Sequence, residues 1–192
     1  MHLVDICQPS AIIDARGVSP MNTYEVTYIT QPIEEALEEA LLEHDVNVGC
    51  HSGLHFVMAS LVTGDFQTAA EELAKDLKGR GVPIERMELD LVNQSGIAIR
   101  CDKSRQAVGK WVQCRDNPFP KPYAVVSGPL WAWSDVNEWL RRTGKDCYED
   151  ACSANPAQVD AFNAAWRAAS WSQVEAVHCP RSRSTAGDPA AA

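Results

Sequence analysis

The 192-residue sequence predicts a mixed α+β fold built from two regions with different patterning. Between residues 21 and 92, segments with period-two alternation are separated by two segments with helical spacing. Between residues 93 and 145, two short helical segments are followed by a proline-rich stretch, a hairpin and a last helix. A chain of this length has room for two small domains.

The first region follows the order strand-helix-strand-strand-helix-strand. Thr23–Thr30 alternates along its length, as a strand with one buried face does. Apolar residues recur at helical spacing from Ile33 to Leu41 and again within Phe66–Lys78. The other three strands are expected at Val46–Cys50, Leu54–Val62 and Ile84–Leu91. This order is the split βαβ arrangement of ferredoxin-like domains.

The second region begins with two short helices separated by a polar break. The first helix carries an apolar stripe made of Ile97, Ala98 and Cys101. Asp102 and Lys103 interrupt the pattern, and Ser104 is a good N-cap for a second helix over residues 104–113. The inner face of that helix consists of Ala107, Val108 and Trp111. Its outer face carries Arg105, Gln106 and Lys110. This spacing is that of a helix-turn-helix.

A hairpin and a third helix are expected after the helix-turn-helix. Asn117–Pro122 contains three prolines, which lack amide donors and bias the preceding residues toward extended backbone. Tyr123–Ser127 and Leu130–Trp133 then read as two strands, and Ser134 is expected to cap the last helix. A helix-turn-helix followed by a hairpin and a helix is a winged helix-turn-helix.

Charge is distributed unevenly along the chain. The whole sequence carries a formal charge of −9. Residues 1–92 hold 5 Lys and Arg against 16 Asp and Glu, a net charge of −11. Residues 93–145 hold 9 against 4, a net of +5, and residues 146–192 hold 3 against 6, a net of −3. Lys and Arg neutralise phosphates, so only the middle region could supply affinity for nucleic acid.

Three motifs stand in order between Leu91 and Thr143. They are Ser104-Arg-Gln-Ala-Val108, Phe119-Pro-Lys-Pro122, and the run Trp131–Leu140 with its three tryptophans. In order and spacing they resemble the excisionase/AlpA-type branch of the MerR-like winged helix-turn-helix proteins. The chain departs from that family at the turn, where Asp102 and Lys103 stand in place of Gly and an apolar residue. Over residues 21–144 it is also similar to bacterial proteins that join an acidic module to such a domain.

The resemblance implies a sequence-specific transcriptional regulator that binds double-stranded DNA. In such proteins the second helix lies in the major groove with its N-terminal residues against base edges, which here are Ser104, Arg105 and Gln106. The forked side chains of Arg and Gln match guanine and adenine there. Lys110, Arg115 and Lys121 flank the hairpin and are expected to contact phosphates.

The acidic first region leaves a second function open. Phosphates would repel its glutamate face, made of Glu34, Glu35, Glu38, Glu39 and Glu43. We therefore expect the module to point away from DNA and to form a homodimer through its sheet. A helix at Pro156–Trp171 that covers the sheet would instead leave a monomer. The alternative function is a protein-interaction module, antitoxin- or adaptor-like, with a degenerate winged helix.

Cysteine and histidine residues favour neither a metal site nor an enzyme. The seven cysteines are odd in number and include no CxxC pair. Cys50, His51 and His55 could form part of a zinc site or a nucleophilic pair, but no fourth ligand and no catalytic motif accompanies them. Cys101 is expected in the core. The sequence thus predicts no cofactor, no enzymatic activity, no membrane contact and a reduced cytoplasmic location.

The predicted organisation has four parts. Residues 1–20 form a loose segment, with Met21 a candidate natural start, and residues 21–92 form the acidic ferredoxin-like domain. The winged helix-turn-helix occupies residues 93–145. Residues 146–192 hold one helix and a tail that is expected to be disordered from Cys179 onward.

Overall fold

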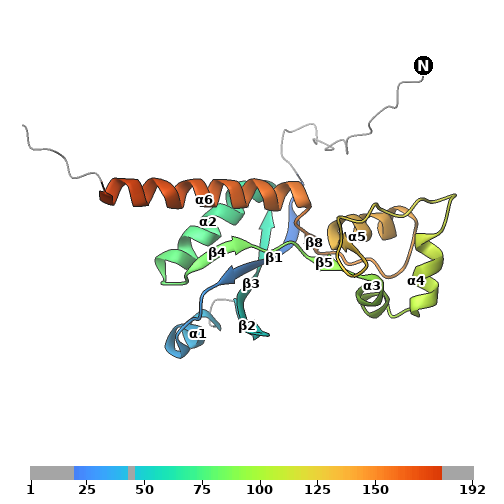
Figure 1. The fold of residues 1–192 in the computed structure, drawn as a ribbon, viewed down its shortest axis with the longest axis horizontal. Coiled ribbons are helices and arrows are strands. Elements are labelled where there is room, and N and C mark those ends of the chain that lie inside the picture. Colours follow the sequence, from blue (N-terminus) through green and yellow to red (C-terminus); the bar gives the residue numbers. More distant parts are fainter. Residues whose placement is uncertain (1–19, 43–45, 179–192) are drawn as a thin grey trace, which may run out of the picture.

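The computed structural model describes residues 20–42 and 46–178, which form six helices and two sheets (Figure 1). The chain is mixed α+β, as predicted. Its buried side chains divide into two hydrophobic cores, one for each sheet. The expectations for residues 1–19, for Glu43 and for the tail from Cys179 lie outside the described residues.

The first sheet has the strand order β2-β3-β1-β4, and neighbouring strands in this order are antiparallel. Its strands are β1 (Asn22–Thr30), β2 (Asn47–His51), β3 (Leu54–Thr63) and β4 (Ile84–Met87). A fifth strand, β8 (Cys152–Ser153), pairs in parallel with Tyr24 and Glu25 near the start of β1. Because β3 occupies the other edge of β1, β8 lies on the same edge as β4.

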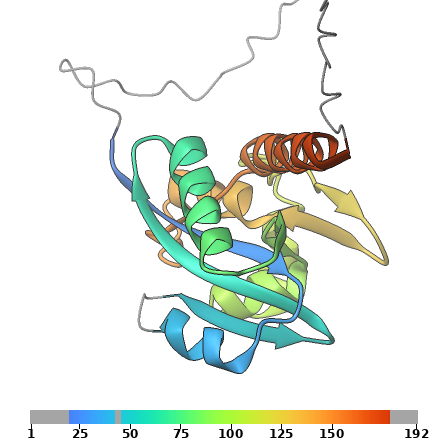
Figure 2. The same cartoon turned by 90° about the vertical axis from the view of Figure 1, so that its left-hand side faces the viewer.

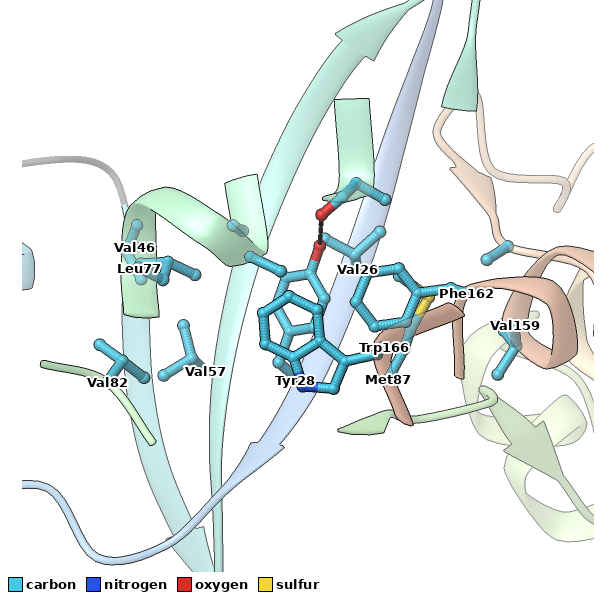
Figure 3. Close-up of a cluster of buried hydrophobic side chains, with 14 of the residues drawn as sticks. Val26, Tyr28, Val46, Val57, Leu77, Val82, Met87, Val159, Phe162 and Trp166 are labelled. Carbon is cyan, nitrogen blue, oxygen red and sulfur yellow. Dashed lines mark hydrogen bonds between the residues drawn. The ribbon is translucent and has the colours of Figure 1, made fainter. Parts of the chain in front are cut away.

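Three helices contribute to the core of this sheet. They are α1 (Glu35–Leu42), α2 (Phe66–Gly79) and α6 (Pro156–His178). Asp65 caps α2, accepting hydrogen bonds from the Thr68 amide at 3.3 Å and the Thr68 hydroxyl at 2.7 Å. The buried Tyr28 hydroxyl of β1 donates to the Ala70 carbonyl of α2 at 2.8 Å, which holds the helix against this strand (Figure 3).

Helix α6 completes the first core, although the second unit lies between α6 and the other elements of that core in the sequence. Val159, Phe162 and Trp166 are buried beside Tyr28 and Met87 (Figure 3). The Asn163 side chain also bonds to both main-chain groups of Met87, at 2.8 and 3.0 Å. The helix therefore covers the face of the sheet that α2 covers (Figure 2). On the opposite face Met58 and Val62 are exposed.

The second unit has its own three-stranded antiparallel sheet in the order β5-β7-β6. Its elements are β5 (Leu91–Val92), α3 (Gln94–Arg100), α4 (Arg105–Val112), β6 (Ala124–Val125), β7 (Pro129–Ala132) and α5 (Trp133–Arg142). Trp131, Trp133 and Trp139 fill its core, as large apolar side chains do in a small domain.

Two boundaries differ from the sequence prediction. The single strand expected at Ile84–Leu91 is two strands, because the chain leaves the first sheet after Met87 and joins the second at Leu91. Ser134 does not cap the last helix: α5 begins at Trp133, and the Ser134 hydroxyl is buried without a partner in the described part of the chain. The Trp133 amide donates instead to the Asp90 carbonyl at 2.8 Å, which fixes where the helix starts.

The second unit is inserted between β4 and β8, two strands of the first sheet. Arg100 of α3 binds the segment that connects β4 of the first unit to β5 of the second. Its guanidinium donates to both carboxylate oxygens of Asp90, at 2.8 and 3.1 Å, and lies 4.6 Å from the Trp133 ring centroid. A cavity of about 500 Å³ opens beside this pair, between the exposed face of the sheet and α3.

Candidate nucleic-acid interface

Helices α3 and α4 form a pair whose first turns are both capped by side chains. Asn93 accepts from the Gly96 amide at 2.8 Å, and Ser104 accepts from the Ala107 amide at 3.2 Å. The prediction that Ser104 is an N-cap is therefore confirmed. Because the cap hydroxyl is engaged at the helix terminus, the first turn of α4 has a fixed start.

The turn between the helices is closed by the Schellman pattern of main-chain hydrogen bonds. The Lys103 amide donates to the Ala98 carbonyl at 2.9 Å, and the Asp102 amide donates to the Ile99 carbonyl at 3.2 Å. This pattern requires a left-handed residue after the C-cap, and Asp102 has a φ of +48°. Asp102 thus takes the conformation for which the resembling family uses glycine. Lys103 is exposed, with its Nζ 3.8 Å from an Asp146 carboxylate oxygen.

One face of α4 packs into the second core. Val108 is fully buried, and Trp111 packs against Trp139 with ring centroids 5.9 Å apart. Cys101, at the end of α3, is buried as predicted. Burial, with a smaller contribution from Cys147, raises the pKa of the Cys101 thiol to about 12, so this group stays protonated at neutral pH.

The predicted contact residues all lie on the surface of this unit. Arg105, Gln106 and Lys110 form the outer face of α4, which stands at the end of the molecule away from α6 (Figure 1). Ser104 is exposed at the N-terminus of the same helix. Arg115 follows α4 and Lys121 precedes the hairpin, and both are exposed. The structure therefore places three of these six side chains on α4, one at its N-cap and the other two on the loop that follows it.

The nine basic residues of 93–145 fall into two groups. Four have partners: Arg100 pairs with Asp90, Lys103 with Asp146, Arg141 with Glu138, and Lys145 lies over the Trp111 ring. The other five have no ion pair or ring contact within the described ranges 20–42 and 46–178. They are Arg105, Lys110, Arg115, Lys121 and Arg142. Four of these five are predicted phosphate or base contacts.

Two features of this surface were not predicted from the sequence. Arg142, in the last turn of α5, is exposed like the predicted contacts. The hairpin tip is apolar, with Val125 76% and Val126 68% exposed. The sequence predicts a strand over Tyr123–Ser127. The strand is only two residues long, however, so these valines lie at or beyond its end.

Cys50 and His55 lie together on the first unit, whereas His51 points to the other face of the hairpin. Cys50 is opposite His55 in the β2–β3 register, and its Sγ is 3.7 Å from His55 Nε2. His51 is opposite Leu54 and alternates to the reverse face. Across the described residues, no three His, Cys, Asp or Glu side chains are grouped to hold a metal ion.

No protein-family model, curated protein or solved structure matches this chain. Within the described residues, each helix is too short or too polar to cross a bilayer.

Proposed function

We propose that the chain is a sequence-specific double-stranded DNA-binding transcriptional regulator that reads the major groove with α4. The observation that carries this proposal is the set of basic side chains on and beside α4 that have no acidic partner among residues 20–42 and 46–178. A cation already paired to a carboxylate must break that pair to bind phosphate, and Arg105, Lys110, Arg115 and Lys121 would not have to do so.

The arrangement of elements supports the finer fold assignment. The order β5-α3-α4-β6-β7-α5, with β7 in the centre of the sheet, is the order expected of a winged helix-turn-helix. We assign it to the excisionase/AlpA-type branch on the motifs at Ser104–Val108 and Phe119–Pro122. The antiparallel order β2-β3-β1-β4, with helices after β1 and β3, supports a ferredoxin-like first unit.

The exposed side chains divide between two roles in this proposal. Arg105 and Gln106 stand in the first turn of α4, where a recognition helix meets base edges. Lys110, Arg115 and Lys121 lie further along the helix and the loop, where phosphate contacts position a domain without reading sequence. The acidic first unit would point away from the duplex, because its net charge of −11 over residues 1–92 opposes phosphate.

The test is selection of bound sequences from random duplexes with the full chain, followed by anisotropy titrations. Arg105→Ala and Gln106→Ala should each weaken the selected site by about 1–3 kcal/mol and relax preference at one or two base pairs. Lys121→Ala should weaken all sequences alike and reduce the salt slope by about one unit. Lys75→Ala is the matched control, because Lys75 lies on α2 and pairs with Glu71. Failure to enrich any sequence, with no salt-dependent binding, would contradict the proposal.

The apolar hairpin tip favours one second candidate, a protein-interaction module. Tyr123, Val125 and Val126 are exposed on the hairpin, and a DNA-contacting wing has no evident need for two exposed valines. In that case a Val125→Asp, Val126→Asp double variant would leave any DNA affinity unchanged and would abolish partner capture. A loss of DNA affinity in the same variant would place the hairpin on the duplex instead.

A further inference from the structure

The β2–β3 hairpin brings a thiol and an imidazole into direct opposition. Ser52 and Gly53 form its two-residue loop, with φ values of +51° and +82°. Two positive φ values are characteristic of a type I′ turn, which sets the register of the strands on either side. Cys50 therefore lies directly across from His55, and the Sγ to Nε2 separation is 3.7 Å.

That separation is the one that two ligands of a tetrahedral zinc ion require. Zinc lies about 2.3 Å from a thiolate and about 2.0–2.1 Å from an imidazole nitrogen, so the two ligand atoms stand about 3.6 Å apart at the tetrahedral angle. Cys50 and His55 could bind one ion without moving their strands. Thiolate and imidazole together favour zinc over calcium or magnesium, which prefer oxygen ligands.

A buried hydroxyl lies next to His55 on the following strand, β1, in the same register row as Cys50. Thr30 is opposite His55 on β1, and it is 4% exposed with no hydrogen-bond partner for its Oγ1 in the described structure. A metal-bound histidine usually donates its second ring N–H to a neighbouring acceptor. The Thr30 hydroxyl stands in the register position where His55 could find such an acceptor.

Two ligands from one chain leave half of a structural zinc site empty. In the described residues no third Cys, His, Asp or Glu joins Cys50 and His55. The sheet order ends at β2, so the hairpin that carries both ligands lies at the edge of the sheet, and Cys50 is exposed there. A second copy approaching this edge about a two-fold axis would supply the same two ligands.

We propose that Cys50 and His55 from two copies of the chain bind one Zn²⁺ ion in a Cys2His2 site at the β2 edge. Each thiol loses its proton to solvent as the zinc–sulfur bond forms, and each histidine binds as the neutral imidazole. The site is closed and structural, because all four positions are taken by protein. This proposal does not depend on DNA binding.

The experiment titrates the metal-free, reduced full chain with Zn²⁺ while light scattering follows its mass, and with Co²⁺ as a coloured probe. We expect one ion per two chains, a zinc-dependent dimer that EDTA dissociates, and a cobalt spectrum of a tetrahedral site with thiolate ligands. Cys50→Ser and His55→Ala should each abolish both dimer and spectrum. His51→Ala and Cys152→Ser are matched controls that should change neither, because His51 faces away and Cys152 lies on β8.

Four results would overturn the proposal. One ion per chain without a change of mass would show that a single chain completes the site. A dimer that persists in EDTA, or a cobalt spectrum that survives in Cys50→Ser, would show that other groups are responsible. Absence of any binding by the full chain would leave Cys50 and His55 as an ordinary sulfur–imidazole contact. Circular dichroism of each variant separates loss of the site from loss of folding.

Discussion

The Gln94 side chain of α3 donates from Nε2 to the main-chain carbonyl of Arg105, the first residue of α4, at 2.7 Å. The same Gln94 nitrogen also lies close to Gly109 of α4: a Cβ atom added to Gly109 would be 3.0 Å from this nitrogen. The two helices therefore approach closely because Gly109 has no side chain. The contact fixes the first turn of α4, which carries the proposed base-reading residues.

Replacing Gly96 of α3 and Gly109 of α4 with alanine should give different results. Gly96→Ala meets only ordinary contacts, the nearest at 3.6 Å, so its higher helix propensity should raise the free energy of unfolding by about 0.5–1 kcal/mol. Gly109→Ala must displace the Gln94 side-chain amide, so it should raise the free energy of unfolding by less than Gly96→Ala does. It should also weaken DNA binding, because the displaced amide no longer holds the Arg105 carbonyl in the first turn of α4. Urea denaturation and anisotropy measure the two effects. Equal stabilisation with unchanged affinity would show that the Gln94 contact does not matter.

Asp102→Gly should stabilise the second unit by about 0.5–1 kcal/mol. Asp102 holds a left-handed conformation at the end of α3, and the matching positions after α2 and α5 are Gly81 and Gly144. Glycine removes the steric cost of that conformation, although its greater freedom in the unfolded chain offsets part of the gain. Asp102→Ala is the control and should destabilise. The measurement is the midpoint of thermal unfolding, and a lower midpoint for the glycine variant would contradict the expectation.

The N-cap of α2 should make stability depend on pH in the acid range. Hydrogen bonds from the Thr68 side chain and amide lower the pKa of Asp65 below its ordinary value. A group with a lowered folded pKa stabilises the protein at neutral pH and loses that contribution as pH falls through the folded pKa. Asp65→Ala should therefore be less stable than wild type at pH 7. The difference should shrink below about pH 4, as urea titrations at several pH values would show.

Tyr28→Phe should lower the free energy of unfolding by about 1 kcal/mol. Burial raises the pKa of Tyr28 well above its usual range, so the phenol stays protonated and remains the donor to Ala70. The phenylalanine ring keeps the packing against Phe162, whose centroid is 5.5 Å away, and removes only the hydrogen bond. Tyr24→Phe, at a half-buried position of the same strand, is the control and should have a smaller effect.

Local patterns predicted the elements that depend on neighbours in sequence. The helical spacing of apolar residues correctly predicted that α2 begins at Phe66. The N-cap residue Ser104 correctly predicted where α4 begins. The polar outer face of α4 was likewise evident, because exposure follows from the same periodicity that buries Val108. The exposure of the predicted DNA-contacting residues could therefore be foreseen from the sequence, while their function remains a prediction.

Features that depend on residues distant in the sequence could not be predicted from local patterns. Apolar residues alternate from Met87 through Leu89 to Leu91, so nothing in the pattern marks that β4 ends at Met87 and that β5 joins a different sheet. The start of α5 is set by the Asp90 carbonyl, more than forty residues upstream, and not by the adjacent Ser134. The Cys50–His55 pairing was not predicted, although it depends only on local structure, because the two-residue loop at Ser52-Gly53 sets that register.

The insertion of the second unit between β4 and β8 has a consequence for how the molecule could be rebuilt. Both ends of the unit are anchored near one edge of β1, by β4 at Tyr28–Thr30 and by β8 at Tyr24–Glu25. A chain cut after residue 145 would lose Phe162 and Trp166 and open the first core. A chain in which a short linker replaces residues 91–151 would keep every strand of the first sheet and α6. The second unit is thus an insertion that could be removed, and the first core closes only after the residues that follow the insertion have been synthesised.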